Sequence, residues 1–228
     1  HTLFSKKPFV GATMAISSHL TLLTGIAGIN VYIVRILKLP FDISLHFYFF
    51  FFVGVIITGI LKMFFYSSVG AGFLGTLGSS ALLYVSIHWI ILGNTINIPL
   101  LYIQGLLLGF GASMTLVSGS MATLLDGDLK EAAQRSQTMH TIRNFSAAML
   151  IPIIAYTIKN HIQKGTQSIY AENITDKMIY LKKLQDVAID ADHQIFLLMI
   201  IFNMVMFVSS IIQMILGKGR RITPPRES

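Results

Sequence analysis

Apolar residues are arranged along this chain in six long runs, which short polar or charged stretches separate. The runs cover residues 8–34, 45–65, 69–92, 98–125, 141–158 and 194–216. Each run approaches the ~20 residues that an α-helix needs to cross ~30 Å of hydrocarbon. The pattern therefore predicts an all-α integral membrane bundle of six transmembrane helices.

The composition supports a membrane protein. Hydrophobic residues make up 54% of the chain and charged residues only 12%, which would leave a soluble domain of 228 residues with too little polar surface. The chain has no cysteine, so disulfides, thiolate metal sites and cysteine nucleophiles are excluded. The chain opens at His1 and enters the membrane almost at once, and we expect it to be a piece of a longer protein.

The basic residues predict the orientation. Six crossings place both termini on one side, and ten of the 17 Lys and Arg residues fall on that side. The other basic residues lie mostly in one long segment, where five acidic residues dilute their charge. The positive-inside rule then places both termini of this segment in the cytoplasm, and we expect the inner (plasma) membrane. A nucleic-acid partner is not expected, because the chain has no soluble basic face.

One domain is expected over residues 1–228, with an outer loop at about 161–193 and a short cytoplasmic tail at 217–228. Within the loop, Asn173 and Asp176 resemble the start of a helix. Apolar residues then recur at helical spacing at Met178, Leu181 and Leu184. This predicts a short amphipathic helix on the outer surface.

Small residues repeat every four positions in two of the runs. The two sets are Ala71, Gly75 and Ser79, and Gly105, Gly109 and Ser113. Such spacing lines one helix face with side chains that let another backbone approach closely. These faces either form ordinary helix contacts or slide against partners during a transport cycle.

The sequence holds no recognisable enzymatic or metal-binding motif. The seven histidines have no ligand-like spacing, so we expect neither a metal site nor a cofactor. All ten acidic residues are assigned to loops, span edges or the tail. Because proton-coupled carriers commonly use a membrane-embedded carboxylate, any such group is expected outside this chain.

A few polar residues fall inside the runs. Among these, His19, Asn30 and Gln104 either line a cavity or form hydrogen bonds between helices. Trp89 is interpreted as an interface anchor. Arg143 is placed at the start of the fifth span, where it is either a headgroup anchor or a gate whose guanidinium holds the inner ends of neighbouring helices together.

Several stretches resemble the C-terminal half of major facilitator superfamily transporters, most closely the fourteen-span drug:proton antiporters. They are Gly105-Leu-Leu-Leu-Gly109-Phe-Gly111, Leu125-Asp-Gly-Asp, Ala133 to Gln137, and Thr141-Ile-Arg143-Asn-Phe145. Leu3-Phe4 followed by Lys6-Lys7-Pro8-Phe9 is similar to the family's basic linker. The stretch Lys62-Met-Phe-Phe-Tyr66 lacks the Gly-x-x-x-Asp-Arg-x-Gly signature often found between the second and third spans of a half.

The resemblance implies a secondary active transporter that works by alternating access, with proton-coupled efflux of small or amphipathic molecules. It implies three partners: membrane lipid, a missing N-terminal half of the same transporter, and a small-molecule substrate. The first and fourth spans of such a half line the central cavity. The cavity candidates are then His19, Asn30, Gln104 and Ser113, with Arg143 at the inner gate.

The alternative is a self-contained six-span membrane protein, such as a membrane enzyme, a channel subunit or an assembly subunit. A membrane enzyme would gather histidines or acids at one membrane face, and this sequence does not.

Overall fold

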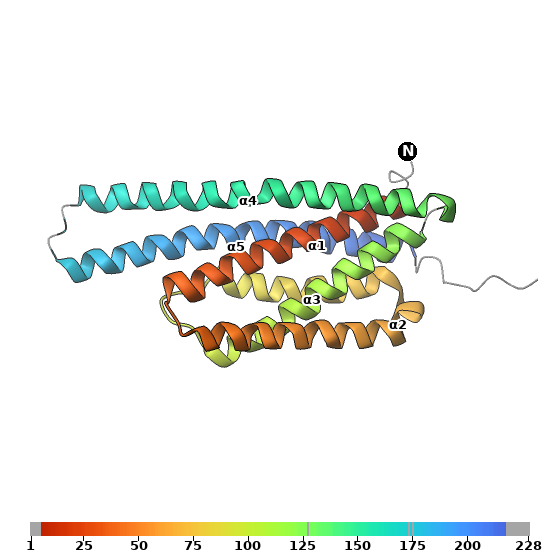
Figure 1. The fold of residues 1–228 in the computed structure, drawn as a ribbon, viewed down its shortest axis with the longest axis horizontal. Helices are drawn as coiled ribbons and strands as arrows, with labels where there is room; N and C mark the ends of the chain where they lie inside the picture. The colour runs from red at the N-terminus through yellow and green to blue at the C-terminus, as the bar shows by residue number, and fades with distance from the viewer. Residues whose placement is uncertain (1–5, 127, 173, 175, 218–228) are drawn as a thin grey trace, which may run out of the picture.

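The computed structural model describes residues 6–126, 128–172, 174 and 176–217. These residues form helices and no strand (Figure 1). The elements are α1 (Lys6–Asn30), a π-helix η2 (Val31–Ile36), α2 (Phe41–Trp89), α3 (Ile98–Leu125), a short 3-10 helix η3 (Leu129–Glu131), α4 (Ala132–Ala171) and α5 (Lys177–Ile215). The predicted all-α class is confirmed, and five of the described helices are long and apolar enough to cross a membrane.

The predicted count of six separate helices is not matched, because the second and third runs form the single 49-residue helix α2. One residue inside α2, Gly70, has a non-helical backbone with φ 82° and ψ 170°. The break between the second and third apolar runs is Tyr66-Ser67-Ser68, which is too short and too weakly polar to form a separate loop. The direction of the chain therefore reverses at Gly70, as Figure 1 shows at the end of the bundle.

The first limb of α2, residues 41–69, runs parallel to α3. A Cβ added at Gly105 would lie 2.8 Å from the carbonyl oxygen of Phe47, and one at Gly109 would lie 1.9 Å from that of Phe51. The residue numbers rise together along both helices. Glycine is required at these positions because the two backbones touch.

The second limb of α2, residues 71–89, runs antiparallel to α3. A Cβ at Gly78 would lie 2.9 Å from the carbonyl oxygen of Gly111, and the indole of Trp89 donates a hydrogen bond to Gln104. Here the residue numbers rise along one helix and fall along the other. The two limbs of α2 thus run in opposite directions beside the same helix.

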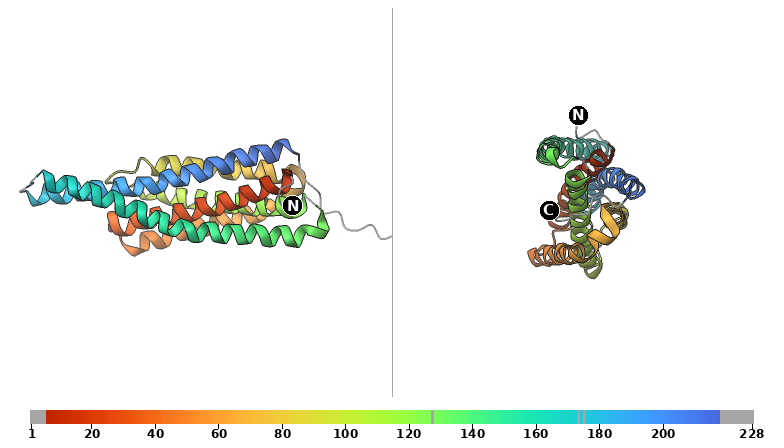
Figure 2. Two further views of the ribbon diagram at one scale, coloured as in Figure 1. Left: turned by 90° about the horizontal axis from the view of Figure 1, so that it is seen from above. Right: turned by 90° about the vertical axis from the view of Figure 1, so that its right-hand side faces the viewer.

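Helices α1 and α3 form the centre of the bundle. They run antiparallel in close contact, since a Cβ at Gly11 would lie 3.0 Å from the carbonyl oxygen of Gly119. The end view on the right of Figure 2 shows α4 and the first limb of α2 on opposite sides of this central pair, with α5 and the second limb on a third side of it. One face of the α1 and α3 pair therefore has α4 on one side and the first limb of α2 on the other. We call it the flanked face.

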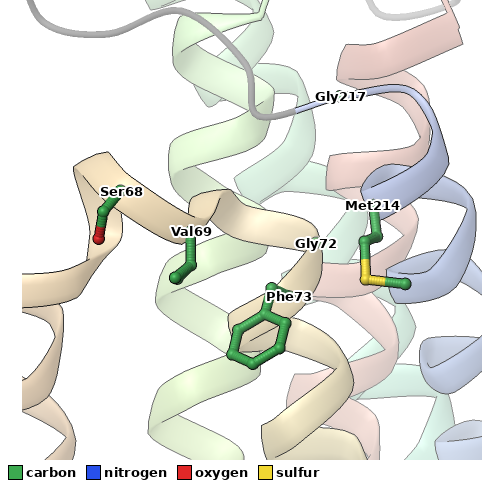
Figure 3. A pocket seen from close by; sticks show the side chains of 6 residues that line it. All are labelled: Ser68, Val69, Gly72, Phe73, Met214 and Gly217. Carbon is green, nitrogen blue, oxygen red and sulfur yellow. The ribbon is translucent and has the colours of Figure 1, made fainter.

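The back of the bundle is closed by α5. At its far end, Gly72 lies directly against the backbone of Met214, where a Cβ would be 2.2 Å from the amide nitrogen. A small apolar cavity of about 290 Å³ lies beside this contact, between the reversal of α2 and the end of α5 (Figure 3). Halfway along the bundle, Gly25 of α1 lies against the side chain of Met199.

Helices α4 and α5 have 40 and 39 residues, so each is about 60 Å long, about twice the hydrocarbon thickness. Figure 1 shows them projecting past the other helices as an antiparallel hairpin, held by contacts such as Gly165 against Val187.

The predicted outer loop is thus mostly helical, and the predicted surface helix is the first part of α5 and not a separate element. Asp176 is its N-cap and accepts a bond from the Met178 amide at 2.8 Å. Asn173, Leu3, Phe4 and the tail beyond Gly217 lie outside the described residues.

Gly70→Ala tests the reversal in α2. The φ and ψ of Gly70 lie in a region that is essentially restricted to glycine, so alanine should destabilise the fold by about 1–3 kcal/mol. The measurement is the melting temperature in detergent. The matched control is Gly59→Ala in the same helix, where the added methyl meets nothing within 4 Å. Equal melting temperatures for the two variants would contradict the reversal.

Candidate functional site

A polar connection crosses the central helix pair near the middle of α1. The Ser18 hydroxyl lies 2.6 Å from the Thr115 hydroxyl and donates to the carbonyl of Ala112 at 3.2 Å. The next residues along each helix, His19 and Ser113, therefore lie at the same depth. Two of the predicted cavity residues thus lie at one level of the central helix pair.

Each of these two residues is associated with a basic side chain from a flanking helix. Lys62, on the first limb of α2, donates to the backbone carbonyl of Ser113. Arg143, on α4, lies close enough to His19 to interact with it electrostatically. We call Lys62, Ser113, His19 and Arg143 the cationic band. All four residues are partly exposed.

The band lies beside open space and contains an unsatisfied group. A groove of about 450 Å³ runs between the first limb of α2 and α3, lined by Lys62, Ser113 and the apolar Val117 and Met121 among others. The Nε of Arg143 is buried without a hydrogen-bond partner among the described residues. Charged groups inside a membrane bundle are costly, and those that occur usually face a cavity or a partner. The band can therefore hold an anionic group, from a ligand or from another protein segment.

Arg143 is not at the start of its helix, as the sequence analysis expected. Helix α4 begins at Ala132, so Arg143 is about three turns inside it. The stretch before Arg143 was assigned to a loop because it is polar, but in the structure it continues the helix. Arg143 thus lies near the level of His19, at the middle of α1, and not at an inner end.

Arg135 makes the kind of contact that was expected of Arg143, from a guanidinium to backbone carbonyls at a helix end. The gate role of Arg143 stays a prediction. The side chain of Arg135 is 1% exposed. It donates to the carbonyls of Thr123 at 3.0 Å, Leu124 at 2.9 Å and Asp128 at 2.8 Å. Thr123 and Leu124 lie in the last turn of α3, where backbone carbonyls lack helical partners, and Asp128 lies in the turn that follows. The planar guanidinium contacts all three carbonyls at once. The signal in the sequence was an arginine shortly after a helix end.

The other two cavity candidates are engaged in hydrogen bonds between helices. The carbonyl of the Asn30 side chain accepts from the Tyr48 hydroxyl at 2.9 Å. That of Gln104 accepts from the Trp89 indole at 2.8 Å, and Gln104 is only 2% exposed. The prediction of Trp89 as an interface anchor is wrong, because its side chain is fully buried and lies 5.4 Å from the ring of Phe196.

The small residues of the second limb of α2 lie at the back of the bundle. Ala71 and Ser79 are buried. A Cβ at Gly75 would lie 2.6 Å from the sulfur of Met14 and 2.8 Å from the Ser210 hydroxyl. Together with Gly105 and Gly109 on α3, these residues line tight helix contacts.

One acidic residue is not where the sequence analysis placed it. Asp192 was assigned to the outer loop, but it lies within α5 and is 1% exposed. Neither carboxylate oxygen has a hydrogen-bond partner among the described residues. The assignment failed because the apolar run was taken to begin at residue 194, whereas Ile189 and Ala191 are already buried on the same helix. No group of three or more potential metal ligands occurs in the described part of the chain.

Comparison with known proteins does not assign the chain. No family model matches it, and no curated protein matches its sequence. The functional interpretation therefore depends on the geometry described above and on the residues that resemble the major facilitator superfamily.

The bond between Trp89 and Gln104 is testable by fluorescence, because Trp89 is the single tryptophan of the chain. Gln104→Leu leaves the buried indole N–H without an acceptor, which should destabilise the fold by about 1–3 kcal/mol. It should also shift the tryptophan emission maximum. The control is Gln167→Leu, which alters an exposed amide on the protruding part of α4. Equal stability and emission in both variants would contradict the bond.

Proposed function

We propose that this chain is half of a secondary active transporter of the major facilitator type, in which the flanked face forms one wall of a central cavity. The proposal is supported by an internal repeat: the first three and the last three membrane crossings make similar helix contacts. If the two limbs of α2 are counted separately, the chain crosses the membrane six times. The first three crossings are then α1 and the two limbs, and the last three are α3, α4 and α5.

Exchanging these two sets of three preserves the main contacts of the central helices α1 and α3. Helix α1 contacts α4 and α5, and its counterpart α3 contacts the first and second limbs of α2. The exchange replaces α1 by α3 and the second limb of α2 by α5. The contact between α1 and α3, and the contact between the second limb and α5, are therefore each their own counterpart. Because each set has an odd number of crossings, the two sets have opposite orientations in the membrane. Inverted repeats of three helices are the internal organisation of a major facilitator half.

This organisation makes α1 and α3 the cavity helices. The cationic band lies on these helices and on the two that flank them. Helix α4 also presents many apolar side chains to its surroundings, such as Phe145 at 67% exposed and Ile151 at 67%. Such a surface needs lipid or another protein segment to cover it. An N-terminal half that faces this side would close the cavity.

In this proposal the protein moves small or amphipathic molecules by alternating access, with proton-coupled efflux as the expected direction. Both termini of the segment lie in the cytoplasm, as the distribution of basic residues favours. A channel or assembly subunit is the second candidate. The transporter is preferred because the inverted repeat provides two equivalent ways for the cavity to open.

The six crossings are tested by labelling single cysteines introduced into the chain, which has none of its own. Cysteines at Ser67 and Lys130 should react only from the cytoplasmic side, and those at Thr95 and Lys177 only from outside. Ser67 lies just before the reversal at Gly70, and Thr95 lies after the second limb. Reaction of Ser67 and Thr95 from the same side would show that the second limb does not cross.

Transport itself is tested in inverted vesicles that contain the native full-length protein, with ethidium and Hoechst 33342 as probes. Arg143→Lys should leave the folded yield unchanged and lower the initial rate of pH-driven uptake about tenfold, because lysine keeps the charge but loses the planar set of donors. The control is Lys164→Gln on the protruding hairpin. Uptake at the normal rate in Arg143→Lys would remove this residue from the site. Uptake of neither probe by the unmodified protein would count against efflux of such molecules.

A further inference from the structure

Asp192 lies deep between helices at the outer end of the bundle. Its side chain faces the part of α1 that forms the π-helix η2, since Tyr32 of that segment is near enough to interact with it electrostatically. Tyr32 is itself fully buried. An ionised carboxylate without a partner is unfavourable in such surroundings, and a group in this position usually becomes neutral by taking up a proton.

A cavity lies between η2 and α5, near Asp192 along α5. It has a volume of about 480 Å³ and is lined by the end of η2 and by the first part of α5, including Arg35, Lys38, Gln185 and Ala188. Ala188 is one turn before Asp192 on the same face of α5. The cavity thus ends one helical turn from the carboxylate.

The wall of this cavity on α1 is an irregular helix. The Leu37 amide donates to the Tyr32 carbonyl at 2.9 Å, which is the wide π pattern, and the Leu39 amide donates to the Ile33 carbonyl at 3.0 Å. Lys38 then has a positive φ of 50°. Wide turns of this type occur often at functional sites, and they can tighten into a regular helix with a shift of one residue.

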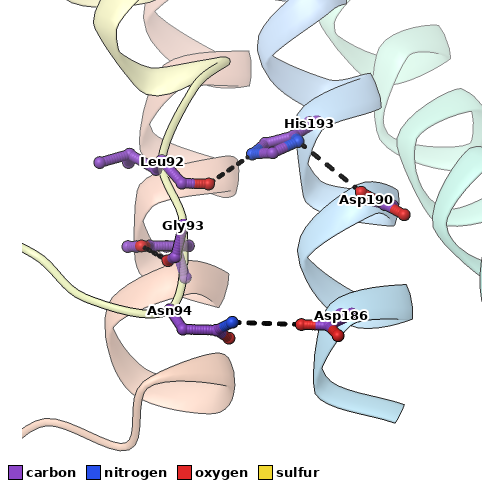
Figure 4. A network of polar contacts seen from close by, with 7 residues as sticks. Leu92, Gly93, Asn94, Asp186, Asp190 and His193 are labelled. Carbon is purple, nitrogen blue, oxygen red and sulfur yellow. Dashed lines mark hydrogen bonds and ion pairs between the residues drawn. The ribbon is translucent and has the colours of Figure 1, made fainter. Parts of the chain in front are cut away.

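The loop between α2 and α3 fastens the same region. His193, the neighbour of Asp192, donates from Nε2 to the Leu92 carbonyl at 2.7 Å, and Asn94 donates to Asp186 at 3.2 Å. Tyr32 donates to the carbonyl of Gly93. Figure 4 shows the loop held from α5 by these side chains. The loop therefore ties α1 to α5 on either side of Asp192.

Titratable and charged groups lie on the three elements around Asp192, and Tyr32 is the one with an electrostatic interaction with it among the described residues. Helix α1 and its extension contribute Tyr32, Arg35 and Lys38. Helix α4 contributes His161, one turn from the Gly165 that touches Val187, and the Nδ1 of His161 is also buried without a partner among the described residues. Helix α5 itself contributes Asp186, Asp190 and His193. None of these groups hydrogen-bonds the carboxylate in the described part of the structure.

We propose that Asp192 is a proton-binding site that is reached from the outer side through this cavity. Among the described residues no group of three or more acidic or histidine side chains that could hold a metal ion occurs, whereas a single carboxylate can bind one proton (COO⁻ + H⁺ → COOH). When the outer end is closed the neutral acid is favoured by burial. When α1 and α5 separate, water and the basic rim residues Arg35 and Lys38 stabilise the carboxylate, and the proton is released outward or taken up from there.

The coupling of this site to transport rests on the proposed function, but proton binding does not. Infrared difference spectra of the reconstituted full-length protein, recorded between acidic and alkaline pH, should contain a band from a protonated carboxyl group. The band should be lost in Asp192→Asn and retained in Asp190→Asn, which alters an exposed acid two residues away. In Asp192→Glu the band should shift in frequency, and this variant serves if Asp192→Asn does not fold. An unchanged band in Asp192→Asn or in Asp192→Glu would overturn the proposal.

A second measurement tests the link to opening. A cysteine at Gln185 is labelled with a polar maleimide, and its rate at each pH is divided by the rate of a cysteine at the exposed Gln163 on α4, because the thiolate fraction itself rises with pH. The ratio should rise at alkaline pH, where the ionised carboxylate favours the open cavity, and in Asp192→Asn it should stay low at every pH, because the side chain is permanently neutral. A wild-type pH dependence in Asp192→Asn would overturn the link. Failure of the unmodified protein to transport any probe, with the infrared band still assigned to Asp192, would reject the transporter and keep the proton site.

Discussion

The whole bundle depends on direct backbone contact between helices at small residues. In a membrane, lipid chains solvate apolar side chains as well as another helix does, so helices associate through close packing and hydrogen bonds. Here the contacts leave no space for a side chain: a Cβ at Gly54 would lie 2.1 Å from the Leu106 carbonyl oxygen, and one at Gly109 would lie 1.9 Å from that of Phe51. Helix α3 carries glycines on two sides, so it can contact both limbs of α2 closely. The first limb and α4 then lie on opposite sides of the central pair.

Buried polar groups in this bundle fall into two classes, and the difference is informative. Most have partners: Trp89 with Gln104, Ser18 with Thr115, and Arg135 with three carbonyls. These bonds connect helices that are already in contact, so they stabilise one arrangement. Arg143 and Asp192 contain buried atoms without partners in the described residues. A polar group in an apolar bundle that lacks a partner favours binding of something further, which is why both residues carry our functional proposals.

The two proposed sites lie at different depths. The cationic band is near the middle of α1, whereas Asp192 lies beside the C-terminal end of the same helix, near Tyr32. Helix α1 therefore lies beside both proposed sites. The π-helix that extends it lies between the cavity lined by Arg35 and Lys38 and the regular helical turns that contain His19. In the proposed transporter, a change in α1 at Asp192 would reach the band through a single continuous helix.

The sequence by itself determined the class of the protein. The length and spacing of apolar runs predicted an all-α membrane fold, because hydrophobicity averaged over ~20 residues reports how a segment partitions into lipid. It could not locate the boundaries of α4 and α5, since polar residues continue a helix as readily as apolar ones outside the bilayer. Only the tertiary structure decided that Gly70 reverses the chain, that Arg135 and not Arg143 closes the end of α3, and that Asp192 is buried. The burial and partners of a single side chain depend on which helix lies opposite it, and that is a property of the packed bundle and not of the local sequence.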